Sequence, residues 1–222
     1  FGCYEAAAMQ LGHLDLRKLF HEFNHCLHQV LMTNAHRRLN AINELGLGAA
    51  EFAGKLLEQW CWSAACMQSV TRHSSGGTPV PLVDIQRWLA ARGTQRGLEL
   101  ADEWKKALLD FELHRGHANG LGIDQVVAHV YARTQVLPLA DNDRFANGFD
   151  YWATGYEAGY YCYLWAEEHA SDVFAWFRRH GVFDPRLGEA MRKELLAPGA
   201  SRPLSASLQA FAGRARLIVG GG

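Results

Sequence analysis

The sequence predicts an all-α fold, and three observations support this. Apolar residues recur at helical spacing along most of the 222 residues, and no alternating stretch is long enough to predict a sheet. The breaker cluster HSSGGTPVP and short Gly-containing connections separate the helical segments. Hydrophobic residues make up 49% of the chain and charged residues 20%, as in a folded protein with a core. We therefore expect a single multi-helix domain over residues 1–222.

Five helices are expected in the first part of the chain. Asp15 can cap the first, which runs through LRKLFHEFNHCLHQVLMTNAHRR. A loop containing Gly46 and Gly48 follows, and the second helix extends from Glu51 to about Thr71, where the breaker cluster stops it. The next three helices are expected in PLVDIQRWLAAR, GLELADEWKKALLDFELHR and IDQVVAHVYART.

A long irregular loop and three more helices are expected in the remainder. Residues 136–149 carry loop-forming residues, and a loop of that length in a compact domain is often functional. A long helix is predicted from about Gly155 to Arg179. Two further helices are predicted in DPRLGEAMRKELL and LSASLQAFAGRA, which completes the all-α chain.

The composition argues against several classes of protein. The 22 Lys and Arg nearly balance the 23 Asp and Glu, so no basic surface for nucleic acid or an anionic membrane is expected. No apolar run approaches the length of a membrane span. The five cysteines are odd in number and show no clustered spacing, which argues against a disulfide framework and predicts a reducing, cytoplasmic compartment. They are Cys3, Cys26, Cys61, Cys66 and Cys162.

Residues 21–25 form an HExxH motif, which predicts a zinc site on a helix. Residues four apart lie on one helical face, so the imidazoles of His21 and His25 can converge on a single Zn²⁺. Glu22, next to the first histidine, can act as a general base on a water at that site. A catalytic zinc also needs a third protein ligand and an open fourth position.

The third ligand is open on the residues alone. Glu51 is the first candidate because it follows the Gly-containing loop and returns over the HExxH face if the two helices are antiparallel, but Glu44 and Glu58 are also in range. Glu58, two turns beyond Glu51, can instead accept a hydrogen bond from a ligand histidine. His28 extends the same helical face and is better interpreted as a structural histidine than as a ligand.

Three tyrosines share one face of the helix expected after Gly155. Tyr156, Tyr160 and Tyr163 are spaced at i, i+4 and i+7. They can form an aromatic core stripe, or their hydroxyls can donate hydrogen bonds to an oxyanion that develops beside a zinc site. Both interpretations stay open on spacing alone.

Four segments together resemble a known family. LFHEFNHCLH, EFAGKLLEQWCW, GYEAGYYCYLWAEEHASDVFAWF and LLAPGAS…FAGRA, in this order, resemble the thimet oligopeptidase/oligopeptidase A/dipeptidyl carboxypeptidase family of zinc metallopeptidases. The resemblance covers about residues 14–214 and implies the zincin-like catalytic core of a longer, mostly helical and intracellular enzyme that cuts short peptides. It also implies contact with further N-terminal helices, or with another chain.

The resemblance implies a role for each matching residue of the metal site. His21, His25 and Glu51 match the ligands of one Zn²⁺ per chain, and Glu22 matches the general base. Glu58 matches the glutamate that closes the third-ligand segment.

The resemblance also implies roles for tyrosines. Tyr156 and Tyr163 match tyrosines that contact substrate and stabilise the tetrahedral intermediate, and Tyr160 lies beside them in the sequence. Tyr151 stands where the family has a histidine of the catalytic cleft; a phenol can donate a hydrogen bond but cannot become cationic near neutral pH.

Two further departures fall near the metal motif. Asn24 stands where the family has Gly, and its side chain is expected to crowd a neighbouring element. Residues 53–55 read Ala-Gly-Lys where the family has Pro-Ser-Gln, which removes a proline from the start of a helix and places a helix-weakening glycine there.

The sequence therefore leads to a first hypothesis of a zinc-dependent oligopeptidase, or endopeptidase, that hydrolyses short peptides. Two alternatives stay open. The departures from the family pattern are compatible with a non-catalytic or degenerate zinc-binding domain, and a zincin site also suits a zinc carboxypeptidase acting on free C-termini.

Overall fold

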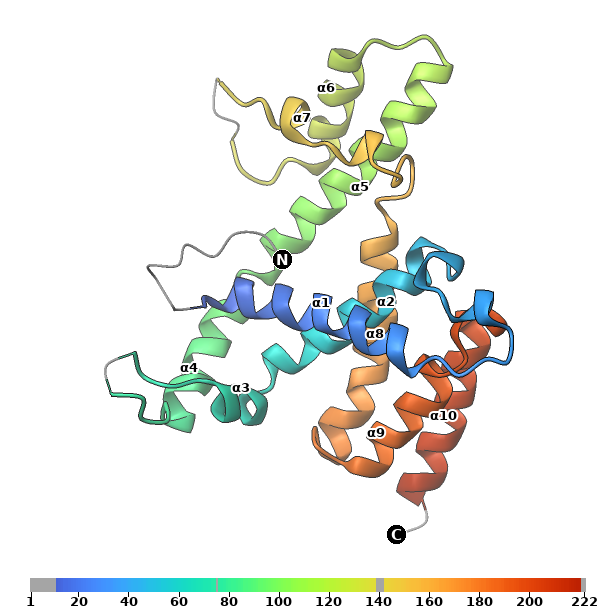
Figure 1. Ribbon diagram of the computed structural model, residues 1–222. Helices are drawn as coiled ribbons and strands as arrows, with labels where there is room; N and C mark the ends of the chain where they lie inside the picture. The colour runs from blue at the N-terminus through green and yellow to red at the C-terminus, as the bar shows by residue number, and fades with distance from the viewer. Residues whose placement is uncertain (1–10, 75, 139–141, 221–222) are drawn as a thin grey trace. The chain divides into compact units, whose positions relative to one another are not determined.

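The computed structural model describes residues 11–74, 76–138 and 142–220, and within them the predicted all-α fold is confirmed. These residues contain no β-strand beyond one isolated antiparallel bridge between Arg72 and Pro79. The chain divides into two compact units, one built from residues 1–89 and 166–222 and the other from residues 90–165 (Figure 1). That residues 1–222 form a single catalytic domain stays a prediction.

The described residues form α-helices joined in places by short helical turns. The α-helices are α1 (His13–Leu31), α2 (Leu47–Glu58), α3 (Ala64–Val70), α4 (Leu82–Gly93), α5 (Arg96–Ala118), α6 (Ile123–Thr134), α7 (Phe145–Gly148), α8 (Cys162–His180), α9 (Pro185–Met191) and α10 (Leu204–Gly220). The 3₁₀ turns are η1 (Arg37–Asn40), η2 (Ile42–Glu44), η3 (Gln59–Trp62), η4 (Tyr151–Ala153) and η6 (Gly199–Ser201), and η5 (Arg192–Leu196) is a π-helical turn.

The first helix differs from its prediction at both ends. Asp15 does not occupy the N-cap position. The N-cap is Gly12. Asp15 lies in the first turn of the helix, and its Oδ2 accepts the backbone N–H of Gly12 at 2.9 Å. The helix ends at Leu31, and the 3₁₀ turn η1 follows where the prediction continued the helix to Arg38. The HExxH motif therefore lies in the middle of α1.

The helix predicted from Glu51 to Thr71 is wrong in its boundaries. It begins earlier, because Gly46 adopts a left-handed φ of 78° and α2 starts at Leu47, which places Glu51 in the second turn. It is also interrupted: α2 ends at Glu58, η3 follows, and Ser63 caps a separate helix, α3, by accepting the N–H of Cys66 at 3.4 Å.

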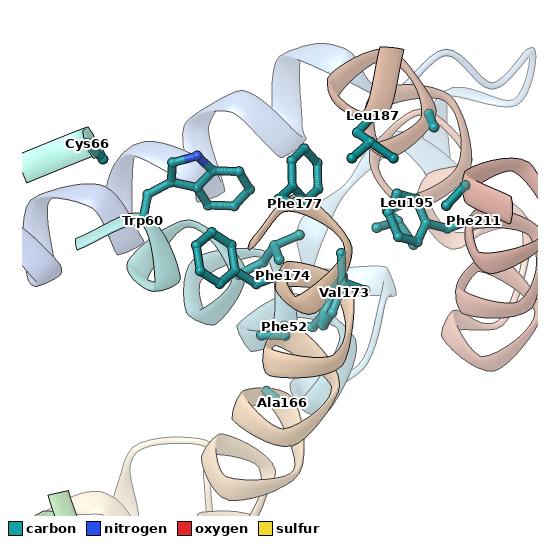
Figure 2. Close-up of a cluster of buried hydrophobic side chains, with 14 residues drawn as sticks. Phe52, Trp60, Cys66, Ala166, Val173, Phe174, Phe177, Leu187, Leu195 and Phe211 are labelled. Atoms are coloured by element: carbon teal, nitrogen blue, oxygen red, sulfur yellow. The ribbon is translucent and has the colours of Figure 1, made fainter. Parts of the chain in front are cut away.

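The main core of the first unit fixes α2 against the C-terminal helices (Figure 2). Phe52 and Trp60 pack against Phe174 and Phe177 of α8, and the Trp60 ring lies edge-on to both phenylalanines at 4.8 Å. The Trp60 indole N–H donates to Val182 O at 2.9 Å. Each such side chain contributes about 1.5–3 kcal/mol on burial, so the position of α2 is strongly determined.

The second unit is a helical hairpin of α5 and α6 with a following irregular segment. Leu109, Val126 and Val130 form the buried contact between the two helices. The loop predicted over residues 136–149 is largely irregular and contains the single-turn helix α7, while residues 139–141 lie outside the described residues.

Two expectations from composition can be compared with the described residues. Helices long and apolar enough to cross a membrane are absent from the described parts of the chain. Disulfides are absent among the cysteines that the structure describes, namely Cys26, Cys61, Cys66 and Cys162, and Cys3 lies outside the described residues.

Candidate metal centre

The antiparallel packing of α1 on α2 builds the site. Arg17 near the start of α1 contacts Glu58 at the end of α2, and His25, two turns further along α1, contacts Glu51 near the start of α2. Residue numbers thus rise on one helix as they fall on the other. This arrangement places the histidine face of α1 directly against the acidic residues of α2.

His21, His25 and Glu51 converge on one point. The two Nε2 atoms of the histidines are 3.0 Å apart, and Glu51 Oε2 lies 3.2 Å from His21 Nε2 and 3.9 Å from His25 Nε2. Within the described ranges this is the one group of three or more potential metal ligands whose donor atoms all lie within 4.8 Å of one another.

The donor set fits a zinc ion. Ligand atoms around a tetrahedral zinc at about 2.0–2.1 Å are separated by roughly 3.3 Å, close to the spacings found among His21, His25 and Glu51. The Nε2 atoms of His21 and His25 face each other at 3.0 Å, so once both are deprotonated their lone pairs point into the same space, where one cation can bind both. Two histidines and one carboxylate are a ligand set typical of catalytic zinc.

Glu58 holds the ring of His21 from the opposite side. His21 Nδ1 lies 2.8 Å from Glu58 Oε1, the contact that the sequence suggested. Arg17 donates to Glu58 Oε2 at 2.9 Å, and Lys55 Nζ lies 3.4 Å from Oε1. A proton donated from Nδ1 to a carboxylate fixes the imidazole and leaves Nε2 available as a ligand.

The surroundings shift the pKa values of these groups in different directions. Burial opposes ionisation of Glu58, but His21, Lys55 and Arg17 outweigh it and lower its pKa to about 2. Burial also opposes protonation of His21, but Glu51 and Glu58 raise its pKa to about 9. Burial, helped by the neighbouring His21, lowers the pKa of His25. The cluster is therefore organised around Glu58, whose ionised form the neighbouring cations stabilise.

Gly54 leaves room for the imidazole of His21. A Cβ atom at this position would lie 2.5–2.6 Å from three atoms of the His21 ring, closer than real Cβ contacts approach. The glycine that weakens α2 by propensity is therefore the residue that lets the two helices approach at the metal motif.

Asn24 meets α2 closely, as the sequence suggested, and the contact is a hydrogen bond. Its side chain is fully buried between the helices, and its Nδ2 donates a short hydrogen bond to the backbone oxygen of Ala53. The amide therefore links α1 to α2 one residue away from Gly54.

The other candidate residues near the motif occupy different environments. Glu22 is half-buried on α1, and its charge partly opposes the lowering of the His25 pKa that burial causes. Glu44 is exposed, pairs with Arg38 at 3.2 Å and is not part of the three-residue group. His28 is buried outside the three-residue group, and burial together with His25 lowers its pKa to about 4.

The tyrosines lie in the second unit, and the helix predicted from Gly155 is wrong there. Because α8 begins only at Cys162, Tyr156 and Tyr160 precede the helix and Tyr163 lies in its first turn. Gly155 at φ 94° and Ala158 at φ 54° interrupt any helical path between residues 155 and 161.

The tyrosine rings are nevertheless together. Tyr156 and Tyr163 stack with centroids 5.7 Å apart and planes at 15°. Tyr151 meets both edge-on, at 5.5 Å and 6.1 Å, and also meets Tyr160 at 4.8 Å. Tyr160 is buried, and its hydroxyl donates to Glu103 Oε2 at 3.0 Å.

Sequence reasoning missed the two cations that hold Glu58. Arg17 lies four residues before His21 on the same helical face, and Lys55 lies three residues before Glu58. Helical spacing indicates that Arg17 shares a face with His21 and Lys55 shares a face with Glu58. It does not indicate which of these side chains become buried.

Comparison with known proteins gives a consistent set of relatives. The chain matches the model of Peptidase family M3 over residues 5–218. It is 31% identical over 205 residues to oligopeptidase A of Escherichia coli K12, covering 91% of this chain and 30% of that protein. It is 32% identical over 208 residues to a probable cytosolic oligopeptidase A of Arabidopsis thaliana, covering 90% and 30%. Dipeptidyl carboxypeptidase of E. coli K12 is 28% identical over 212 residues, covering 92% and 30%. The chain thus spans about 30% of the length of these relatives.

Proposed function

Because this chain belongs to peptidase family M3, we propose that it is a zinc-dependent oligopeptidase that hydrolyses short peptides. The observation that carries the proposal is the convergence of His21, His25 and Glu51 within 4.8 Å on packed helices. The oligopeptidase relatives support the substrate class. We propose one zinc ion per chain, which the single group of potential ligands among the described residues supports.

The residues of the first unit have distinct roles in this proposal. His21, His25 and Glu51 hold the metal, and a zinc ion there would supply Lewis-acid polarisation of the scissile carbonyl and of the attacking water. Glu22 takes the proton of that water and passes it to the leaving amine. Glu58 keeps the His21 ring oriented through the 2.8 Å contact at Nδ1.

The tyrosine roles rest on the family resemblance. We propose that Tyr156 and Tyr163 donate hydrogen bonds to the developing oxyanion. Tyr151 is proposed to contact substrate as a neutral donor in place of the family histidine. The same resemblance predicts that Tyr160 contacts substrate, while in the structure its ring is buried and its hydroxyl donates to Glu103 Oε2.

The test combines metal content with hydrolysis of a quenched short peptide. In Glu22→Gln the ligands are untouched, so we expect zinc to remain at one per chain while turnover falls by about 10²–10⁴-fold, the usual contribution of a general base. Glu44→Gln, which changes an exposed carboxylate paired with Arg38 and outside the His21/His25/Glu51 group, is the matched control and should retain activity. A Glu22→Gln protein that hydrolyses peptide at the wild-type rate would refute the mechanism.

A second candidate is a carboxypeptidase that acts on free C-termini. The similarity to dipeptidyl carboxypeptidase of E. coli K12 favours it. Peptides with free and amidated C-termini separate the two, because a carboxypeptidase loses activity on the amide and an oligopeptidase does not. A protein that binds zinc and cleaves neither peptide would support the non-catalytic alternative.

The partners and the location proposed for this chain are based on its relatives. Since the chain spans about 30% of their length, we propose that it contacts further helices, either in a longer chain or in another chain. A cytoplasmic location is supported by the Arabidopsis relative named as cytosolic, while another Arabidopsis relative of equal identity is named as chloroplastic and mitochondrial.

A further inference from the structure

Helix α5 presents two carboxylates to the turn that precedes α8. Glu103 and Asp110 are seven residues apart, two helical turns, and therefore lie on the same face of α5. Both bond to residues of the 155–161 segment, which carries Tyr156 and Tyr160. All of these residues belong to the second unit.

Asp110 is fully buried and bonds to the backbone of the turn. Its Oδ1 accepts the N–H of Ala158 at 3.1 Å, and its Oδ2 accepts the N–H of Tyr160 at 3.0 Å. His114 Nδ1 lies 3.3 Å from Oδ1. A buried carboxylate is costly unless donors surround it, so these contacts determine the local backbone strongly.

The turn that Asp110 holds is conformationally demanding. Ala158 has a φ of 54°, a left-handed conformation that residues with a Cβ rarely adopt. Such a conformation persists where the surroundings over-determine it. One of the two N–H groups bound by Asp110 belongs to Ala158 itself, so the carboxylate stabilises the unfavourable residue directly.

Tyr160 is held at both ends. Its backbone N–H donates to Asp110 and its hydroxyl donates to Glu103 Oε2 at 3.0 Å. Burial and the adjacent Glu103 raise the pKa of the phenol, so it remains a donor. Its ring packs 5.1 Å from that of Tyr163, which in turn stacks on Tyr156.

We infer that Asp110 and Glu103 are positioning residues that hold the 155–161 turn through Tyr160 and thereby fix the phenols of Tyr156 and Tyr163. Tyr160 is then an anchor of the turn and not a substrate contact. The inference rests on the proposed function, since it assigns a catalytic consequence to the position of Tyr156 and Tyr163. A merely structural role would change stability without a selective effect on turnover.

The experiment uses Asp110→Asn, with hydrogen exchange and peptide kinetics as the two measurements. The new amide keeps the shape of the side chain but places an NH₂ donor where a carboxylate oxygen accepted an N–H. We expect amide exchange in residues 155–161 to accelerate at least tenfold and kcat to fall at least tenfold, with KM and zinc content little changed. Tyr160→Phe, which loses only the Glu103 bond, should shift both quantities in the same direction by less.

The control is Glu112→Gln, which alters another buried carboxylate of α5. Glu112 bonds to Arg115 and not to the turn, so exchange in residues 155–161 and kcat should stay at wild-type values. If Asp110→Asn does not fold, Tyr160→Phe provides the same comparison.

The outcomes separate the inference from the function on which it rests. Unchanged exchange in residues 155–161 of the folded Asp110→Asn protein would overturn the anchor, whatever the activity. Faster exchange with a wild-type kcat would overturn the positioning role. An inactive, zinc-loaded wild type would refute the proposed function and with it the catalytic consequence, while exchange would still decide whether Asp110 anchors the turn.

Discussion

Replacing Gly54 with alanine tests the close approach of α1 and α2 at the metal motif. On helix propensity alone the change is favourable, because alanine is better than glycine by about 1 kcal/mol in a helix interior. The structure predicts the opposite sign. The new Cβ would lie 2.5–2.6 Å from the ring of His21, so either the ring or the helix must move.

The magnitude follows from what holds that ring. Its Nδ1 bonds to Glu58 at 2.8 Å, and its Nε2 lies 3.0 Å from that of His25, so displacement disturbs both contacts. Overpacking costs about 1–3 kcal/mol, which leaves a net loss of up to ~2 kcal/mol after the propensity gain. A disturbed ring orientation is expected to weaken zinc binding by about 10–100-fold.

Zinc affinity is the sharper assay, measured by competition with a chromophoric chelator, and thermal unfolding of the metal-free protein is the second. The matched control is Gly213→Ala in α10, where a Cβ meets no atom within 4 Å. There only the propensity acts, so we expect Tm to rise by about 2–4 °C for a gain of ~1 kcal/mol, with zinc affinity unchanged. If Gly54→Ala gives the same rise in Tm and binds zinc as tightly as the wild type, the steric argument is refuted.

Three further substitutions address the supports of the site. Glu58→Gln should weaken zinc binding by about 10–100-fold in the chelator assay, because the His21 ring loses its charged partner; equal affinity would contradict the orienting role. Asn24→Ala leaves the buried oxygen of Ala53 without that donor, so the free energy of unfolding in urea should fall by about 1–3 kcal/mol, and no change would contradict the link. Phe177→Ala in the main core should lower the free energy of unfolding by about 3–5 kcal/mol, and a loss below ~1 kcal/mol would show that this ring is not part of the core.

The sequence predicted the parts of the site that depend on local periodicity. His21 and His25 lie on one face of a helix because four residues complete about one turn, and this holds wherever the helix begins. The choice among Glu44, Glu51 and Glu58 depends on how α1 packs against α2, which no local pattern encodes. Packing turned Glu51 toward both histidines and placed Glu58 behind one of them.

The error at the tyrosines has a nonlocal cause. Spacing at i, i+4 and i+7 favoured a helix from Gly155, but the N–H groups of Ala158 and Tyr160 bond to Asp110, about fifty residues earlier in the chain. A buried carboxylate that takes two backbone donors outweighs weak helical preference over one turn. Asp110 stands within an ordinary helical pattern, so the sequence holds no local signal for this contact.

The departures from the family motif at residues 24, 54 and 55 make contacts between α1 and α2 or with Glu58, and this bears on whether the site is degenerate. Asn24 bonds to the backbone of Ala53, Gly54 makes space for His21, and Lys55 approaches Glu58 at 3.4 Å. Random loss of a binding site is expected to leave voids or unpaired groups where side chains changed. Asn24 Oδ1 is such a group, because it is buried without a hydrogen-bond partner. The changed residues nevertheless keep the helices together and leave the three potential ligand atoms converged, which favours an alternative packing of the site over a decayed one.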